Sequence, residues 1–214
     1  MKTKEIATTI ESNALQIINN IDFKSISFYN FLKSEFGKSN VTENYIFQSV
    51  FRSFYGLDNV GFSEEFKRDY FKLIEKYRNQ QDIDVENVFI DLHRIQNFKG
   101  KDAIVFSFVS KLICTIDDTS PIYDKEVCRV FSFDQPIHKD LSTIIDILRN
   151  QLKLIQNTSL EMIHSNLIPK TLKFFDDKFS GNNLSMIKKL DFIFWSKGKL
   201  DFYEKLMLET EYVH

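Results

Sequence analysis

The chain has 214 residues, of which 43% are hydrophobic, and a formal net charge of −2. This is enough apolar material for a buried core, while the near-neutral charge excludes a protein that binds nucleic acid over its whole surface. Two cysteines exclude a disulfide framework and a four-cysteine zinc or iron–sulfur site. Because neither an apolar leader nor an apolar run of membrane length is visible, we expect a cytoplasmic protein without membrane contact.

The composition favours helices. Glycine and proline number only 6 and 3, whereas average usage in a chain of this length would give about 15 and 11. Turns should therefore be few and the elements between them long. The 22 Phe and 8 Tyr residues predict an aromatic core. We expect an all-α fold of about ten helices.

In the first third of the chain, helical spacing of apolar residues predicts helices over residues 6–20 and 27–37. A third helix is expected from Thr42 to Gly56, where the glycine can adopt a left-handed cap. A fourth follows the N-cap Ser63 over residues 64–79, with its apolar positions in one stripe.

The middle of the chain predicts a helix over residues 85–96, capped by Asp84, and then a strongly apolar run over residues 103–116. Its length favours a central helix, although its Ile, Val and Phe content leaves a buried strand open. After Pro121, a further helix is expected to pass through Val127 and Val130.

The last third predicts helices over residues 139–157, 159–179, 183–198 and 200–209, with Pro169 bending or splitting the second of them. No linker or repeat is visible. We therefore expect a single domain over residues 1–214, with the open alternative of two lobes that meet near residues 100–130.

The segment "PIYDKEVCRVF", from Pro121 to Phe131, fits the pattern P-I-x-D-x-x-V-x-R-V. It resembles the helix-hairpin-helix DNA glycosylase superfamily: adenine-specific members carry a similar run, and members of the 8-oxoguanine branch have a lysine in the preceding helix. The resemblance implies that Lys111 is a Schiff-base nucleophile, that Asp124 stabilises a developing sugar cation and that Tyr123 contacts an extruded base. Since Gly100 is the only glycine of the stretch "GKDAIVFSFVSK" that leads to Lys111, the hairpin is expected to be degenerate.

The implied chemistry has its own physical basis. A lysine forms an imine only when its amine is neutral, and the apolar neighbours Phe108 and Leu112 would lower the pKa of Lys111 in that direction. A carboxylate near the anomeric carbon stabilises the positive charge of the transition state. The alternatives are a Lys111 side chain that reaches from the helix to water and an Asp124 that is an ordinary N-cap.

Candidate phosphate contacts are Arg94, Lys99 and Lys101 near the expected hairpin, together with Arg129. A solvated basic loop, and an Arg129 paired with Glu126 or Asp134, are the alternatives. Likewise, Tyr123 could pack beside Pro121 instead of contacting a base. No ligand-spaced motif supports a metal site, and we expect no cofactor.

The function expected on these grounds is recognition of an altered base in double-stranded DNA, with cleavage of its N-glycosidic bond and an associated lyase step. The alternative is a non-enzymatic helical interaction module of a bacterial defence or regulatory system, which would bind a protein partner.

Overall fold

A computed structural model describes residues 3–80, 82–95, 102–134, 136 and 140–211. Within these residues the fold is entirely helical, with eleven α-helices, one short 3₁₀ helix and no strand, as the sequence predicts. None of these helices has the length and apolar character needed to cross a membrane.

The elements follow one another along the chain in this order: α1 Thr3–Ser12, α2 Ala14–Asn19, α3 Phe23–Phe36, α4 Tyr45–Tyr55, η1 Leu57–Val60, α5 Glu64–Tyr77, α6 Val85–Ile95, α7 Asp102–Ile116, α8 Lys125–Val130, α9 Leu141–His164, α10 Pro169–Lys178 and α11 Met186–Glu211.

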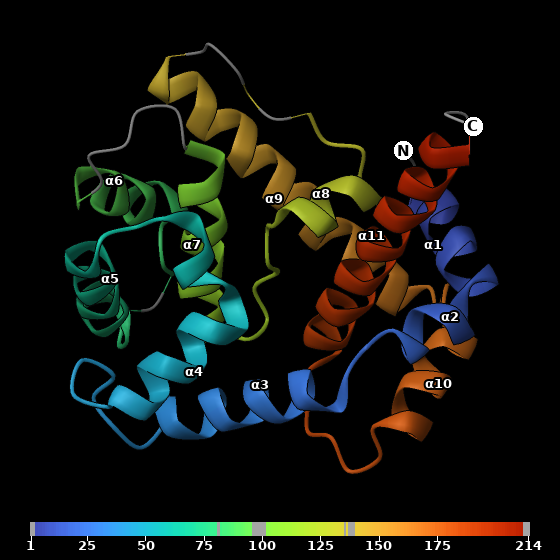
Figure 1. The fold of residues 1–214 in the computed structure, drawn as a ribbon, viewed down its shortest axis with the longest axis horizontal. Coiled ribbons are helices and arrows are strands. Elements are labelled where there is room, and N and C mark those ends of the chain that lie inside the picture. Colours follow the sequence, from blue (N-terminus) through green and yellow to red (C-terminus); the bar gives the residue numbers. More distant parts are fainter. Residues whose placement is uncertain (1–2, 81, 96–101, 135, 137–139, 212–214) are drawn as a thin grey trace.

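The helices gather in two groups (Figure 1). Helices α4 to α7 and η1 pack together on one side, while α1, α2, α8, α10 and α11 pack on the other. Helix α3 runs along one edge of both groups, and α9 contacts members of each. The chain passes between the groups at the loop that joins α7 to α8, so residues on this loop face both.

Local signals at helix ends explain where most elements begin. The Ser63 hydroxyl accepts a hydrogen bond from the Phe66 amide at 3.1 Å and starts α5, as predicted. Asp22, Asn44 and Asp140 cap α3, α4 and α9 in the same way. Gly56 ends α4 in the left-handed conformation, with φ of 69°.

Three expected helix boundaries are wrong. The chain breaks at Asn13, so residues 6–20 belong to two helices instead of one. Conversely, residues 141–164 form a single helix, and Pro169 starts the separate α10, where a proline in the first turn costs no hydrogen bond. The two helices expected at the C-terminal end are the single α11, which runs through Gly198 without interruption.

Aromatic side chains fill the core, as the composition predicts. Phe47, Phe51, Tyr70 and Phe71 are fully buried or nearly so, and Phe51 lies edge-on to Phe71 with ring centroids 5.5 Å apart. The Tyr70 hydroxyl donates to the Phe108 carbonyl at 2.9 Å, which ties α5 to α7. Contacts between buried aromatic rings stabilise the fold by more than the burial of their apolar area alone, so α7 is held rigidly in its group.

Candidate active site

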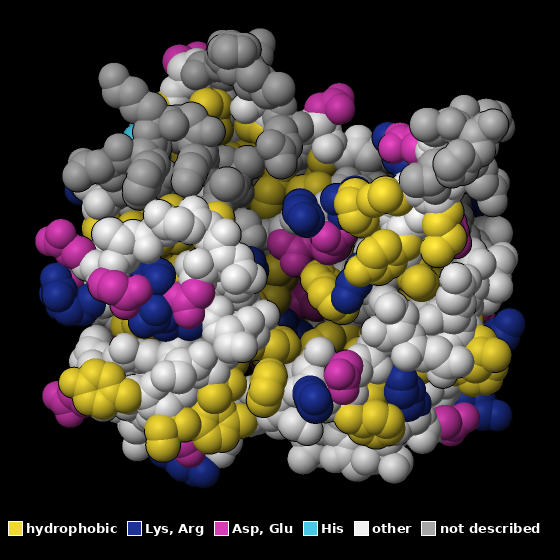
Figure 2. Space-filling model, viewed as in Figure 1, with side chains coloured by type: hydrophobic (Ala, Val, Ile, Leu, Met, Phe, Trp, Pro, Cys, Tyr) yellow, Lys and Arg dark blue, Asp and Glu magenta, His cyan; other side chains and the backbone are white. Residues whose placement is uncertain are grey.

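A pocket of about 490 Å³ opens between the two helix groups. One wall comes from the end of α4, η1 and α7, and the other from the α7–α8 loop, α8 and α11. It corresponds to the hollow near the centre of the surface in Figure 2. Its aromatic lining consists of Phe54, Tyr55, Phe108, Tyr123, Phe192 and Trp195.

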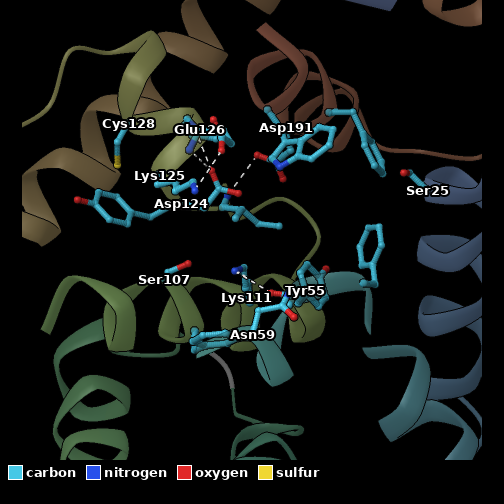
Figure 3. Close-up of a pocket in the computed structure, with 18 of the residues that line it drawn as sticks. Ser25, Tyr55, Asn59, Ser107, Lys111, Asp124, Lys125, Glu126, Cys128 and Asp191 are labelled. Carbon is cyan, nitrogen blue, oxygen red and sulfur yellow. Dashed lines mark hydrogen bonds and ion pairs between the residues drawn. The ribbon is translucent and has the colours of Figure 1, made fainter. Parts of the chain in front are cut away.

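Lys111 lies on α7 and points into the pocket (Figure 3). The side chain is buried, and its amine donates a hydrogen bond to the Tyr55 carbonyl at 3.3 Å and lies 4.5 Å from the Phe108 ring centroid. Within the described part of the chain it forms no ion pair. Burial lowers the pKa of Lys111 below its ordinary value, and the nearby Asp124 offsets only part of this effect.

Asp124 lies on the opposite wall, at the N-terminus of α8 (Figure 3). Its Oδ1 atom accepts hydrogen bonds from the Glu126 and Val127 amides, each at 2.9 Å. The carboxylate is therefore an N-cap, as the alternative interpretation expects. Both bonds use Oδ1, so Oδ2 has no protein donor among the described residues and can face a molecule in the pocket. Capping and a role in the pocket are compatible for this side chain.

A second buried lysine lies deeper on the α11 wall. The Lys188 amine is 3.1 Å from the Asp191 carboxylate and 3.3 Å from the Cys114 sulfur, and both charged side chains are buried. Burial alone would lower the pKa of Lys188, but the acidic groups around it raise the pKa well above its ordinary value. Burial raises the pKa of Asp191 against the opposing effect of Lys188.

This ion pair positions the segment that carries Asp124. The Ile122 amide donates to Asp191 at 3.2 Å, and the Tyr123 amide donates to the Ser110 hydroxyl at 2.9 Å. The chain just before Asp124 is thus fixed to α11 on one side and to α7 on the other. Sequence reasoning overlooked Lys188 and Asp191, although a lysine and an aspartate three residues apart within an apolar helix were a usable signal.

Gly198 allows α8 to lie directly against α11. A Cβ atom at this position would be 1.9 Å from the Glu126 carbonyl oxygen, far inside any permitted contact. The glycine is therefore a packing residue inside a continuous helix and not a helix end, which explains why the expected boundary at residue 198 is absent.

The other predicted site residues are placed differently. The Tyr123 hydroxyl donates to Gln151 at 2.9 Å and its ring lies edge-on to Phe106, so its side chain is held in the core. Arg129 pairs with Glu126, one of the two partners that the alternative named. Arg94, on α6, lies 3.7 Å from Asp91 and does not line the pocket. Lys99 and Lys101, with most of the expected hairpin, lie outside the described residues.

Equal numbers of basic and acidic side chains line the pocket. Lys111, Lys125 and Lys188 face Asp124, Glu126 and Asp191, so this site is not a strongly positive surface. Among the described side chains, no group of three histidines, cysteines or acids could hold a metal ion. Cys114 and Cys128 are free and buried, and burial raises the pKa of both thiols, to about 11 and about 12.

Comparison of the chain with models of known protein families, with curated proteins and with solved structures finds no match. The geometry of the site is therefore the basis on which its chemistry is inferred. A buried amine that releases its proton readily faces a carboxylate across an aromatic pocket, an arrangement suited to attack on an electrophilic carbon beside a flat ring.

Proposed function

We propose that this chain is a DNA glycosylase-like enzyme that recognises an altered base, cleaves its N-glycosidic bond and has an associated lyase activity. The observation that carries the proposal is the Lys111 amine, which is buried without an ion pair in the described structure and has a lowered pKa. A lowered pKa enlarges the fraction of the amine that is neutral, and the neutral amine is the nucleophilic form. With its cysteines reduced, such a protein would work in the cytoplasm.

In the proposed reaction, the bond between the Lys111 nitrogen and the anomeric carbon forms as the glycosidic bond breaks. The base leaves with the bonding electron pair and takes up one proton from the amine. As the C=N bond of the imine forms, the bond from the anomeric carbon to the ring oxygen breaks, and that oxygen takes up the second amine proton. The Oδ2 atom of Asp124, which the cap bonds leave free, would stabilise positive charge on a sugar held in the pocket. A carboxylate held by its cap bonds needs no reorganisation to do this.

The pocket also suits an extruded base. Its volume of about 490 Å³ lies within the range of small-molecule sites. Phe54, Phe192 and Trp195 supply flat apolar surface on which a base can stack. The balanced charge argues that affinity for the DNA backbone comes from residues outside the pocket.

Borohydride trapping tests this function. Duplex DNA that carries 8-oxoguanine or an abasic site should give a covalent adduct with the full chain, and Lys111→Gln should abolish it. Asp124→Asn is the informative second variant: asparagine caps a helix about as well as aspartate but carries no charge. We expect it to keep the fold and slow trapping by about a hundredfold.

The matched control is Lys72→Gln, which removes an exposed lysine on α5, outside the pocket, and should leave the trapping rate unchanged. Absence of an adduct on every damaged duplex would refute the proposal. An adduct that survives Lys111→Gln would assign the nucleophile elsewhere.

A second candidate function, a non-enzymatic interaction module, draws support from the end of α11. Leu206, Met207 and Leu208 are 43%, 68% and 56% exposed, which is unusual for a helix of a monomer. If this candidate is correct, the chain should leave damaged duplexes unmodified and the residues of the pocket should tolerate substitution without loss of partner binding.

A further inference from the structure

A row of basic and aromatic side chains leads out of the pocket over α8 and α11. We name it the basic-aromatic ridge, and it consists of Lys125, Arg129, Trp195, Lys199, Phe202 and Tyr203. Figure 2 shows dark blue and yellow side chains gathered beside the hollow in this region. Lys125 and Trp195 also line the pocket, so the ridge is continuous with it.

Two cations of the ridge lie over aromatic rings of α11. The Lys199 amine lies 4.9 Å from the Trp195 ring centroid and 6.0 Å from that of Tyr203. The Arg129 guanidinium lies 4.4 Å from the Phe202 ring centroid. Phe202 and Tyr203 are 38% and 46% exposed, so the rings keep accessible surface beside these cations.

Between Trp195 and Tyr203, the one acidic side chain of α11 is Asp201, which lies off this face, whereas Asp191 and Glu209, outside this stretch, fall within about 40° of Trp195. At about 100° per residue, Lys199, Phe202 and Tyr203 fall within about 80° of Trp195 around the helix, whereas Glu204 falls on the opposite side. Asp201 is paired with Lys197. The acid that contacts the α8 cations in the described structure is Glu126, whose side chain is only 14% exposed.

We propose that the basic-aromatic ridge binds an unpaired nucleic-acid strand, with bases stacked on its rings and phosphates near its cations. Interleaved rings and cations are the combination that strand-binding surfaces use, whereas protein interfaces are depleted in lysine. From Trp195 to Tyr203 the helix rises about 12 Å, the length of about three to four stacked nucleotides. The inference rests on the proposed function for the assumption that the ligand is a nucleic acid. It adds that an unpaired strand leaves the pocket along the ridge.

The single tryptophan of the chain makes the test direct. Titration of the full chain with an oligothymidylate of about 12 nucleotides should quench Trp195 fluorescence. With about three phosphate contacts, the logarithm of the binding constant should fall with the logarithm of salt concentration with a slope of about −2. Lys199→Gln should weaken binding and flatten this slope, and the double variant Phe202→Ala, Tyr203→Ala should weaken binding at least about fivefold.

Lys72→Gln is the control, because Lys72 lies on α5, away from the ridge, is 60% exposed and pairs with Asp69. It should bind within about twofold of the parent, as an exposed pair contributes little. Lys111→Gln separates the two proposals, since it should abolish trapping and leave quenching intact. Quenching without trapping would support strand binding by the ridge and refute the proposed enzyme. Trapping by the parent, together with unchanged oligonucleotide binding by the ridge variants, would support the enzyme and refute strand binding by the ridge.

Three further outcomes would overturn the inference. The first is no quenching and no salt-dependent binding of the oligothymidylate. The second is equal or tighter binding of a duplex of the same length, which would assign the ridge to double-stranded DNA. The third is a fluorescence change that follows protein concentration alone, which would make the ridge a contact between copies of the chain.

Discussion

The two walls of the pocket each bury one lysine, and the pKa values of the two lysines are shifted in opposite directions. Lys111, on α7, has a backbone carbonyl and aromatic rings as its neighbours, and burial lowers its pKa. Lys188, on α11, lies 3.1 Å from the Asp191 carboxylate, and its surroundings raise its pKa. Both are less than a tenth exposed, so burial alone does not decide the state of a lysine.

The difference separates a structural role from a chemical one. A buried ammonium with a carboxylate partner is held in its charged form and joins two helices. A buried amine without such a partner is driven toward the neutral form, which is the nucleophile. The α11 wall thus supplies rigidity, while the α7 wall supplies the lysine that the proposed function uses as its nucleophile.

The largest effect should come from breaking the pair on the α11 wall. Lys188→Met leaves the Asp191 carboxylate buried without its cation, and the expected loss in the free energy of unfolding is about 3–5 kcal/mol. The measurement is urea denaturation of the variant and the parent at neutral pH.

The double variant Lys188→Met, Asp191→Leu removes both charges and should recover most of this loss, because a well-packed apolar pair often replaces a buried ion pair at little cost. Lys72→Met, which breaks an exposed pair with Asp69, should cost no more than about 0.5 kcal/mol. If Lys188→Met were as mild as Lys72→Met, the two walls would not differ as described.

The next effect concerns the contact that holds α8 on the α11 wall. Gly198→Ala places a methyl group 1.9 Å from the Glu126 carbonyl oxygen, so α8 must move. Overpacking costs about 1–3 kcal/mol, and the upper end applies because the obstacle is backbone that cannot rotate away. The better helix propensity of alanine returns about 1 kcal/mol, so we expect a net loss of about 2 kcal/mol. Because α8 carries Asp124, the trapping rate should fall as well.

Gly37→Ala is the control, since its new Cβ would lie 3.6 Å from the nearest atom in ordinary contact and its φ of −70° suits any residue. Its free energy of unfolding should stay within about 0.5 kcal/mol of the parent. Equal stability of Gly198→Ala and Gly37→Ala would show that α8 can shift freely on α11.

The helical fold could be predicted from the sequence because its signals are local. Scarce glycine and proline, the N-cap Ser63 and the left-handed Gly56 each act within one turn of chain. The boundary expected at Gly198 is wrong for the opposite reason. Whether a glycine ends a helix or permits a close contact depends on what packs against it, and here Glu126, 72 positions earlier, decides.

The candidate site was predictable only in part, for a similar reason. Lys111 and Asp124 stand out because a motif and an apolar run surround them in the sequence. Tyr123 is in the same motif, yet its hydroxyl binds Gln151 of α9, a partner that the motif cannot reveal. The spacing of Lys188 and Asp191 signals their pairing, but their contacts with Cys114 and Ile122 have no signal in the sequence, because only the fold brings those residues close.

The smallest expected effect is a dependence of stability on pH that differs between the two buried lysines. In the unfolded chain Lys111 keeps its proton up to about pH 10.5, whereas in the folded chain burial makes it release the proton at lower pH. Between these two values the unfolded state binds more protons, so the contribution of Lys111 to the free energy of unfolding rises with pH. Lys111→Met removes this term and should be as stable as the parent at pH 7 or more stable by about 1 kcal/mol.

The advantage of Lys111→Met should therefore shrink as the pH rises from 7 toward 10.5, measured by urea denaturation at several pH values. Lys188 must behave in the opposite way: since its folded pKa is raised, its stabilising contribution is complete below pH 10.5 and is lost only above it. A stability difference for Lys111→Met that does not change with pH, or that grows in favour of the variant, would mean that Lys111 stays protonated in the folded chain. In that case the two walls would hold lysines of the same kind, and the α7 wall would have no neutral amine to offer.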